Sequence, residues 1–292
     1  EKAGLNKLIK NKDLRWKTIT AEITEIRKQF SGKANPAYKR RTEITAAPDV
    51  VDIPLDAFIE KEPVTVIFSD KGWIKAAKGH VDLDAKVKYK DGDRGKFILH
   101  AETTDRILLF ATNGRFYTIP CDKLPGGRGF GEPVRLMIDL TNDHDIIGMF
   151  LYKPEMKYLA ASSAGRGFVV RSEDVVAQTK GGKQILNVKG DDEAVAICVV
   201  AGDSIAVIGK NRKLLLFPLD EVPEMTRGRG VILQRYKDGG LVDIKTFTKA
   251  EGLSWKTGGK TRTETDLMAW EGKRAQAGRL PPKGFSRTNK FS

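Results

Sequence analysis

Apolar residues near the start of the chain recur with the spacing of an α-helix. Three or four positions separate neighbouring members of this set: Trp16, Ile19, Ile23, Ile26 and Phe30. Charged residues stand between them, so the apolar side chains would share one helical face. We predict an amphipathic helix that ends near residues 31–32, followed by a polar segment with a basic run at 39–41. On its own, such a run is typical of a solvated linker.

From about Glu62 onward the pattern changes to short apolar runs of strand length. These runs lie at 64–68, 106–110, 116–119, 168–170, 194–200, 205–208 and 214–217. Paired runs flank a turn that recurs five times, at Gly72, Gly114, Gly165, Arg212 and Gly258. The intervals are 42, 51, 47 and 46 residues, which is the size of a four-stranded propeller blade. Four of the turns hold glycine, as a tight hairpin with positive φ favours.

The repeat therefore predicts a mainly β fold: a propeller-like disc of about five four-stranded blades, preceded by the amphipathic helix. We expect the helix within residues 1–31, a linker over 32–61 and the disc over 62–292. The first and fifth units match the pattern less well than the middle three. The disc could be open or closed.

A glycine-rich loop with basic residues follows each hairpin, at 90–96, 126–129, 178–183, 227–230 and 273–279. Glycine lets backbone N–H groups approach a phosphate closely while the cation neutralises it. For one loop alone, a solvated turn is the simpler interpretation, but repetition in register favours sequence-independent binding of duplex DNA. The candidate DNA-binding residues are Arg94, Lys96, Arg128, Lys180, Lys183, Arg227, Arg229, Lys273, Arg274 and Arg279.

The charge distribution modifies this picture. The net charge of the 292-residue chain is +13, but residues 51–254 carry 30 basic and 29 acidic side chains. The excess lies in residues 1–50, with 12 basic and 6 acidic, and in 255–292, with 9 and 3. Any polyanion binding by the middle must come from the arrangement of its cations. That near-neutral middle also leaves open a protein-interaction propeller whose basic loops dock an acidic regulator.

Several other classes of protein are disfavoured. Two cysteines provide neither a disulfide framework nor a metal knuckle, which fits a reducing cytoplasm. No apolar run is long enough to span a membrane. The Asp143-His144-Asp145 sequence lacks a second His or Cys at ligand spacing, so we expect no metal site there. No catalytic residue is assigned. The chain begins at Glu1 and runs directly into a helical pattern, so we expect a piece of a longer protein.

The hairpin ILLFATNGRFYTI and the following LPGGRGFGEPV resemble the C-terminal domain of the A-subunits of bacterial type IIA topoisomerases. The segment ITEIRKQF and the RRTEI sequence at 40–44 are similar to the end of that family's breakage–reunion core. The resemblance implies a β-pinwheel, a disc whose blades exchange strands and whose basic outer face binds and bends duplex DNA. It also implies that residues 1–31 are the last helix of the core.

Within this family the gyrase branch carries a QRRGGKG-type box and wraps DNA. Here the nearest segment is QTKGGKQ at 178–184, which departs from that box, while GRLPPKGF at 278–285 is similar to the tail of the topoisomerase IV branch. We therefore expect topoisomerase IV, with a gyrase-type wrapping domain as the alternative. The branch implies decatenation and supercoil relaxation by a heterotetramer with the topoisomerase IV B-subunit, associated with the bacterial chromosome. No cofactor is expected in this fragment, and ATP and Mg are expected for the whole enzyme.

Overall fold

The computed structural model describes residues 1–33, 36–39, 59–83, 87–127 and 129–292. The chain forms two compact units, Glu1–Pro54 and Leu55–Ser292. The RRTEI sequence, most of the expected linker and the candidate Arg128 fall outside the described residues.

Among its described residues, the first unit contains two α-helices where the sequence predicts one helix, α1 (Lys2–Lys10) and α2 (Lys12–Gln29). They separate at Asn11, whose side-chain Oδ1 accepts hydrogen bonds from the N–H groups of Asp13 (3.0 Å) and Leu14 (3.2 Å). This is an N-cap, which satisfies two amides at the start of α2. The predicted apolar residues of α2 and its C-cap are all exposed: Trp16, Ile19, Ile23, Ile26 and Phe30. Across the described residues, no helix combines the length and apolar content needed to cross a membrane.

In the second unit, the described strands form five antiparallel sheets, called blades 1 to 5 in chain order. Blade 1 contains β1 (Pro63–Ser69), β2 (Trp73–Lys78), β3 (Gly95–Glu102) and β6 (Glu132–Pro133). Blade 2 contains β4 (Arg106–Ala111), β5 (Arg115–Pro120), β7 (Ile146–Leu151) and β10 (Lys183–Gln184). Blade 3 contains β8 (Lys157–Ser162), β9 (Arg166–Arg171), β11 (Ala194–Val199) and β14 (Val231–Ile232).

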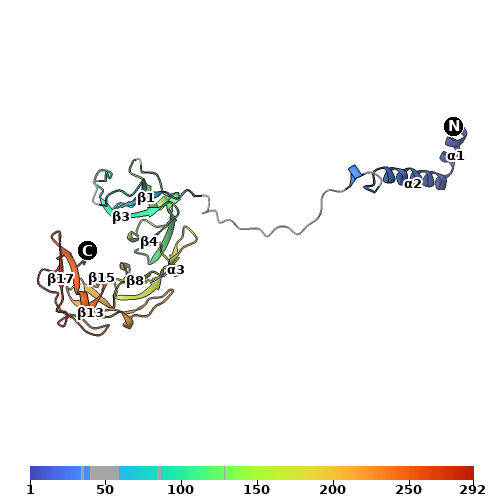
Figure 1. Ribbon diagram of the computed structural model, residues 1–292. Helices are drawn as coiled ribbons and strands as arrows, with labels where there is room; N and C mark the ends of the chain where they lie inside the picture. Colours follow the sequence, from blue (N-terminus) through green and yellow to red (C-terminus); the bar gives the residue numbers. More distant parts are fainter. Residues whose placement is uncertain (34–35, 40–58, 84–86, 128) are drawn as a thin grey trace. The chain divides into compact units, whose positions relative to one another are not determined.

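Blade 4 has three strands, β12 (Ser204–Gly209), β13 (Leu214–Pro218) and β15 (Leu241–Phe247). Blade 5 is the hairpin of β16 (Leu253–Thr257) and β17 (Lys260–Glu264). Short helical segments connect the strands: α3 (Ser172–Val175), η3 (Cys121–Lys123), η4 (Val134–Leu136), η5 (Leu219–Glu221) and η6 (Lys249–Glu251), while η1 (Pro36–Tyr38) lies in the first unit. Figure 1 shows the blades following one another from β1 to β17.

The strand order reveals how each blade is completed. A hairpin such as β4–β5 supplies the two middle strands, and a return strand, here β7, pairs with the first of them. The fourth strand comes from beyond the next hairpin: β6 follows β5 but pairs with β2, and β10 follows β9 but pairs with β5. In blade 4, isolated bridges of Leu214 with Arg279 and Leu216 with Glu271 take this position. The blades therefore exchange strands, as a pinwheel requires.

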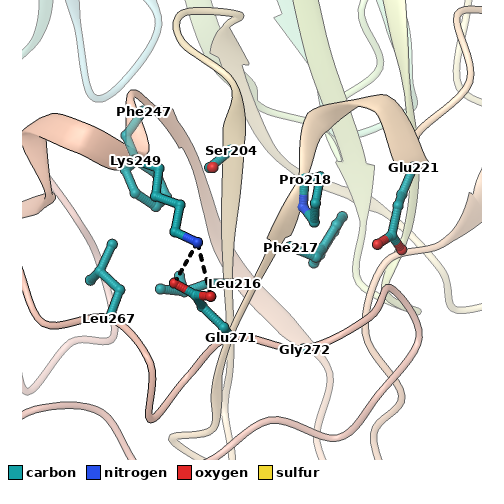
Figure 2. Close-up of a pocket in the computed structure, with 10 residues that line it drawn as sticks. All are labelled: Ser204, Leu216, Phe217, Pro218, Glu221, Phe247, Lys249, Leu267, Glu271 and Gly272. Carbon is teal, nitrogen blue, oxygen red and sulfur yellow. Dashed lines mark hydrogen bonds and ion pairs between the residues drawn. The ribbon is translucent and has the colours of Figure 1, made fainter.

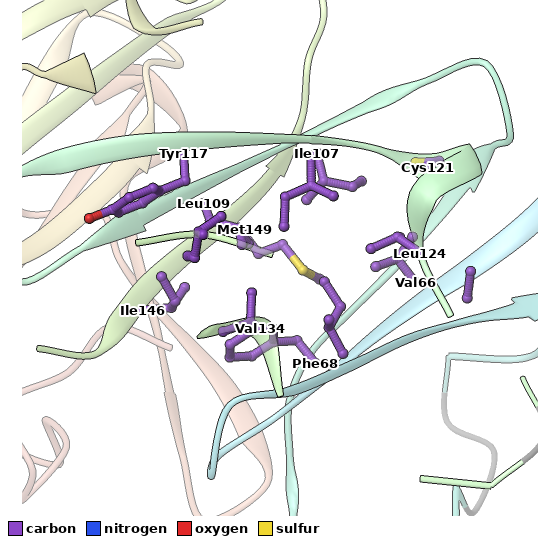
Figure 3. Packing of buried hydrophobic residues seen from close by; sticks show 14 of the residues in the cluster. Val66, Phe68, Ile107, Leu109, Tyr117, Cys121, Leu124, Val134, Ile146 and Met149 are labelled. Carbon is purple, nitrogen blue, oxygen red and sulfur yellow. The ribbon is translucent and has the colours of Figure 1, made fainter. Parts of the chain in front are cut away.

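Apolar side chains fill the spaces between successive blades. Figure 3 shows the cluster between blades 1 and 2, where Val66 and Phe68 meet Ile107, Leu109 and other residues from β4 and β5. Three similar clusters join blade 2 to 3, 3 to 4 and 4 to 5. Among the described residues, none of these clusters joins blade 1 to blade 5. Each hairpin is thus packed on both faces except at the two ends of the series.

The predicted fold class is confirmed, with two differences in detail. Three blades are four-stranded, whereas blades 4 and 5 have three and two named strands. The fourth hairpin turn places Arg212 itself at positive φ, 56°, while Asn211 Oδ1 accepts a hydrogen bond from the N–H of Lys213. An arginine therefore adopts the conformation that glycine adopts in the other four turns.

Candidate nucleic-acid interface

Four of the predicted basic loops lead into the exchanged strand position, and each has glycine at the last residue before it. These glycines are Gly131, Gly182, Gly230 and Gly278, and their φ angles are 87°, 69°, 70° and 77°. A Cβ on any of them would lie less than 3.0 Å from a backbone carbonyl oxygen of the neighbouring hairpin. The positive φ and the close approach both require glycine. The repeated glycine is therefore explained by strand exchange itself.

The cations beside these glycines differ in how free they are. Lys180 and Lys183, in the loop at 178–183, are exposed. In the loop at 227–230, Arg229 and Arg227 are both exposed, and Arg227 Nε donates to Asn187 Oδ1 at 3.3 Å. Lys273 and Arg279 are also exposed, and among the described residues no ion pair involves any of these six side chains. Such cations are available to phosphates.

Arg274 has a different environment from the other predicted residues. Its side chain is half-buried, and Nη1 donates to the carbonyl of Ile232 at 2.7 Å. Its backbone N–H donates to the Glu221 carboxylate at 2.7 Å. These contacts tie the last basic loop to the exchanged strand β14 and to the short helix η5.

The first predicted loop, 90–96, is not equivalent to the others, so the expectation of five loops in register is wrong. This loop leads into β3, which pairs with β1 as the return strand of blade 1. The exchanged strand of blade 1 is β6, which comes later in the chain and pairs with β2. Arg94 Nε lies 3.1 Å from the Asp70 carboxylate, and Lys96 Nζ lies 3.7 Å from it. The similar composition of this loop reflects a turn with locally paired charges.

The exchange loops are hydrogen-bonded to one another in series. The N–H of Asp139, downstream of β6, donates to Lys180 O at 2.9 Å. The N–H of Asn187 donates to Gly228 O at 2.7 Å. Further on, the N–H of Ala275 donates to Leu233 O at 2.9 Å. The basic loops thus form one hydrogen-bonded edge of the second unit, which we call the exchange edge (described residues 125–127, 129–139, 178–187, 224–235 and 270–279).

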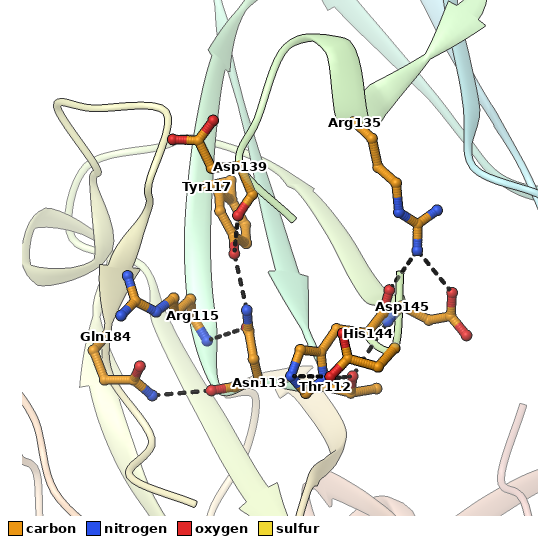
Figure 4. A network of polar contacts seen from close by, with 10 residues as sticks. Thr112, Asn113, Arg115, Tyr117, Arg135, Asp139, His144, Asp145 and Gln184 are labelled. Carbon is orange, nitrogen blue, oxygen red and sulfur yellow. Dashed lines mark hydrogen bonds and ion pairs between the residues drawn. The ribbon is translucent and has the colours of Figure 1, made fainter. Parts of the chain in front are cut away.

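Figure 4 shows how closely the hairpin of blade 2 is joined to this edge. Gln184 Nε2 donates to Asn113 O at 3.0 Å, and Asn113 Nδ2 donates to the hydroxyl of Tyr117 at 2.9 Å. On the other side, Arg135 Nη2 donates to His144 O at 2.6 Å. The network involves side chains of the hairpin and of both exchanged segments that flank it.

Not every cation near the edge is free. Glu224, three residues before Arg227, forms ion pairs with Lys157 Nζ at 2.6 Å and with Arg171. Hydrogen bonds from Lys157 and Arg171 lower the pKa of the Glu224 carboxyl. Lys157 and Arg171 are thus neutralised locally, and the uncompensated charge lies further along the same loop.

Hairpin cations outside the predicted set also contact these loops. Arg115 Nη1 donates to Gly181 O at 2.7 Å, and Arg166 Nη1 donates to Gly230 O at 3.1 Å. The buried Lys75 Nζ donates to Gly129 O at 2.9 Å. Their signal in the sequence is a basic residue one to three positions after each turn glycine, which by itself indicates only the start of a strand.

A hollow of about 370 Å³ beside β13 is the alternative site (Figure 2). Its Lys249 is ion-paired with Glu271 at 2.9 Å, and Ser204 Oγ donates to Asp203 Oδ1 at 2.9 Å. Within the described part of the chain, no group of three or more His, Cys, Asp or Glu is placed to hold a metal. Among the described residues that line the hollow there is no His or Cys, and its lysine is neutralised by Glu271, so the exchange edge is the stronger candidate.

Comparison with known proteins agrees with this architecture. Residues 105–153, 157–200 and 203–244 match the family described as DNA gyrase C-terminal domain, beta-propeller. The whole chain is 45% identical to the DNA topoisomerase 4 A-subunit of Rickettsia bellii and 43% identical to that of Caulobacter vibrioides. This chain belongs to the topoisomerase IV A-subunit family. The family resemblance expected from the sequence is therefore confirmed.

The solved structures similar to this topoisomerase IV-type domain show the same fold. The E. coli ParC C-terminal domain superposes with a TM-score of 0.67 at 27% identity, covering 77% of this chain and 96% of that one. The DNA gyrase A C-terminal domain has a TM-score of 0.54 at 18% identity, covering 78% and 80% of the two chains, and supports the fold alone. The chain spans about 40% of the length of the Rickettsia relative and 39% of the Caulobacter one.

Proposed function

We propose that the second unit binds duplex DNA along the exchange edge without sequence specificity. The observation that carries this proposal is the recurrence, at the exchanged strand position, of glycine loops whose exposed cations have no ion-pair partner among the described residues. Backbone and cationic contacts of this kind position phosphates and carry no base readout. Six of the predicted DNA-binding residues are the proposed contacts: Lys180, Lys183, Arg227, Arg229, Lys273 and Arg279. Arg128, which lies outside the described residues, is proposed as a contact on the sequence alone.

The same arrangement supports DNA bending. The loops lie at successive blades, so one duplex that contacts several of them must follow the edge. Smooth bending of a short duplex costs on the order of 1–6 kcal/mol, which several phosphate contacts can offset. Arg94 and Lys96 are proposed as weaker contributors, since Asp70 already compensates their charge. Arg274 is proposed to contribute through the position of its loop.

For the whole protein we propose ATP-dependent decatenation and supercoil relaxation by a heterotetramer with the topoisomerase IV B-subunit. In that enzyme this domain would orient the transported DNA segment. Residues 1–31, with α1 and α2, would be the end of the breakage–reunion core, and 32–61 the linker. We place the enzyme in the cytoplasm at the chromosome and assign it ATP and Mg outside this chain. No residue of this chain is proposed to be catalytic.

The test is binding of the chain to mixed-sequence duplexes of increasing length across a salt series. Affinity should rise with length until several loops are engaged, and log K should fall with log salt by about 0.9 per phosphate contacted. The combined Lys180→Ala and Lys183→Ala variant should reduce this slope by about 2. A matched control replaces Lys61 and Lys78, which are paired with Glu102 and Glu62, and should leave the slope near that of the wild type.

Weak binding that is indifferent to length would overturn the proposal and favour a propeller that docks an acidic protein. A gyrase-type wrapping domain would give a separate result. It would impose chiral writhe on a nicked plasmid during religation, whereas simple bending would not.

A further inference from the structure

A second set of cations contacts the exchange edge from the neighbouring hairpins. Arg115 and Arg166 begin β5 and β9, are half-buried, and donate to the carbonyls of Gly181 and Gly230. Within the described residues neither guanidinium has an ion-pair partner, so the contact that holds each one is a backbone carbonyl of an exchanged loop. A charged donor to a carbonyl makes a stronger hydrogen bond than a neutral donor does.

The two carbonyls lie next to the proposed DNA contacts. Gly181 stands between Lys180 and Lys183, and the preceding carbonyl, that of Lys180, accepts the N–H of Asp139 at 2.9 Å. The turn itself is closed by the N–H of Gly182, which donates to Thr179 O at 3.1 Å. The backbone between the two lysines is therefore fixed by the Arg115 side chain on one side and by the neighbouring exchanged segment on the other.

The fourth loop provides an internal comparison. Ala277 precedes Gly278 just as Gly181 precedes Gly182, and its carbonyl accepts a hydrogen bond from the Gln234 side-chain amide at 2.7 Å. A neutral amide thus makes the equivalent contact there. Arg115 and Gln234 thus share a contact with the carbonyl that precedes the positive-φ glycine, although only Arg115 is charged. Arg166 donates to the carbonyl of the positive-φ glycine itself, Gly230.

We propose that Arg115 and Arg166 are positioning residues for DNA binding: each holds one exchanged loop so that the cations of that loop face the duplex. Arg115 acts on Lys180 and Lys183, and Arg166 acts on Arg227 and Arg229. The inference rests on the proposed DNA-binding function and adds that these two arginines act through the loops.

The experiment is a set of double-mutant cycles measured by duplex binding across a salt series. Arg115→Met should lower affinity roughly as much as Lys180→Ala with Lys183→Ala, on the order of tenfold, and should reduce the salt slope by about 2. In the Lys180→Ala and Lys183→Ala background, Arg115→Met should cause no further loss, because the contacts it positions are already absent.

Arg166→Met is the matched control. The loss of affinity caused by Arg166→Met should add fully to the loss caused by Lys180→Ala with Lys183→Ala. It should not add to the loss caused by Arg227→Ala with Arg229→Ala. A general loss of stability would not produce this pairwise pattern, and far-UV circular dichroism of each variant verifies the fold.

Two results would overturn the inference. Full additivity of Arg115→Met with the lysine variants, with a slope change of about 1, would make Arg115 a direct phosphate contact. Unchanged affinity in Arg115→Met would show that the loop keeps its position without the contact. If the Lys180→Ala and Lys183→Ala variant binds DNA like the wild type, the DNA-binding proposal for this loop fails. That outcome can be told apart from the two results for Arg115→Met, because it is seen in the lysine variant alone.

Discussion

Blades 3 and 5 start from the same antiparallel hairpin but are completed in different ways. The second hairpin strand of blade 3, β9, pairs with the exchanged strand β14, and its interior residues are buried. In the described chain, β17 of blade 5 pairs with β16 alone, and four of its five residues are exposed. The hairpin is therefore a local unit, whereas a buried blade also needs a strand from elsewhere.

The other edge of blade 5 is covered by residues 284–291. Phe285 packs on Trp255 with ring centroids 5.3 Å apart, and Phe291 packs on Phe285 at 5.4 Å. The N–H of Lys256 donates to Phe291 O at 2.9 Å, and Trp255 Nε1 donates to Gly284 O at 3.2 Å. Aromatic packing by this segment provides in blade 5 part of the stabilisation that paired strands provide in blade 3.

The largest expected effect tests this segment. Phe285 is 4% exposed, and Phe285→Ala should reduce the free energy of unfolding by about 3–5 kcal/mol. Urea denaturation followed by circular dichroism measures it. Phe130→Ala is the control, because Phe130 is 46% exposed and should change the stability by less than about 1 kcal/mol. Similar small effects for both would show that the segment does not stabilise blade 5.

An intermediate effect is expected at the exchanged strand of blade 3. Gly230 has φ 70° and faces the backbone of Gly167, so Gly230→Ala should cost about 2–4 kcal/mol. Gly258, in the blade 5 hairpin, has φ 55°, and a Cβ added there would meet nothing within 4 Å, so Gly258→Ala should cost about 1 kcal/mol. Thermal unfolding of the two variants compares them. Equal costs would mean that the close approach at Gly230 is relieved without loss.

The smallest effect concerns pH. Asp243 Oδ2 accepts the N–H of Phe291 at 2.8 Å, and burial raises the pKa of the Asp243 carboxyl. The folded state then holds this proton more tightly than the unfolded state does. The stability contributed by Asp243 is fully present below its ordinary pKa, about 3.9, and is lost as pH rises through the raised pKa.

The Asp243→Asn variant should remove that pH dependence. The difference in unfolding free energy, wild type minus variant, should decrease as the pH rises from 4 to 7, because the contribution of Asp243 is lost over that range. A difference that increases with pH would contradict the direction of the shift.

The hairpins could be predicted because their signals are local: each turn glycine lies a few residues from both strands that it joins. The exchanged strands could not, since only two residues pair in β6, β10 or β14, far along the chain from their partners. For the same reason, composition alone groups the loop at 90–96 with the exchange loops. The roles of Arg115 and Arg274 depend on carbonyls of distant segments, which no local pattern records.

Strand exchange also gives the polypeptide a direction of maturation during synthesis. The contacts that lock an exchanged loop join Lys75 to Gly129, Arg115 to Gly181 and Arg166 to Gly230, separations of 54, 66 and 64 residues. The chain leaves the ribosome from its N-terminus. The second strand of each hairpin therefore has an unpaired edge until the following repeat, which supplies the exchanged strand, has been synthesised. Blades 1, 2 and 3 thus receive their exchanged strands in that order. A pause in translation within one repeat leaves the preceding blade without its fourth strand.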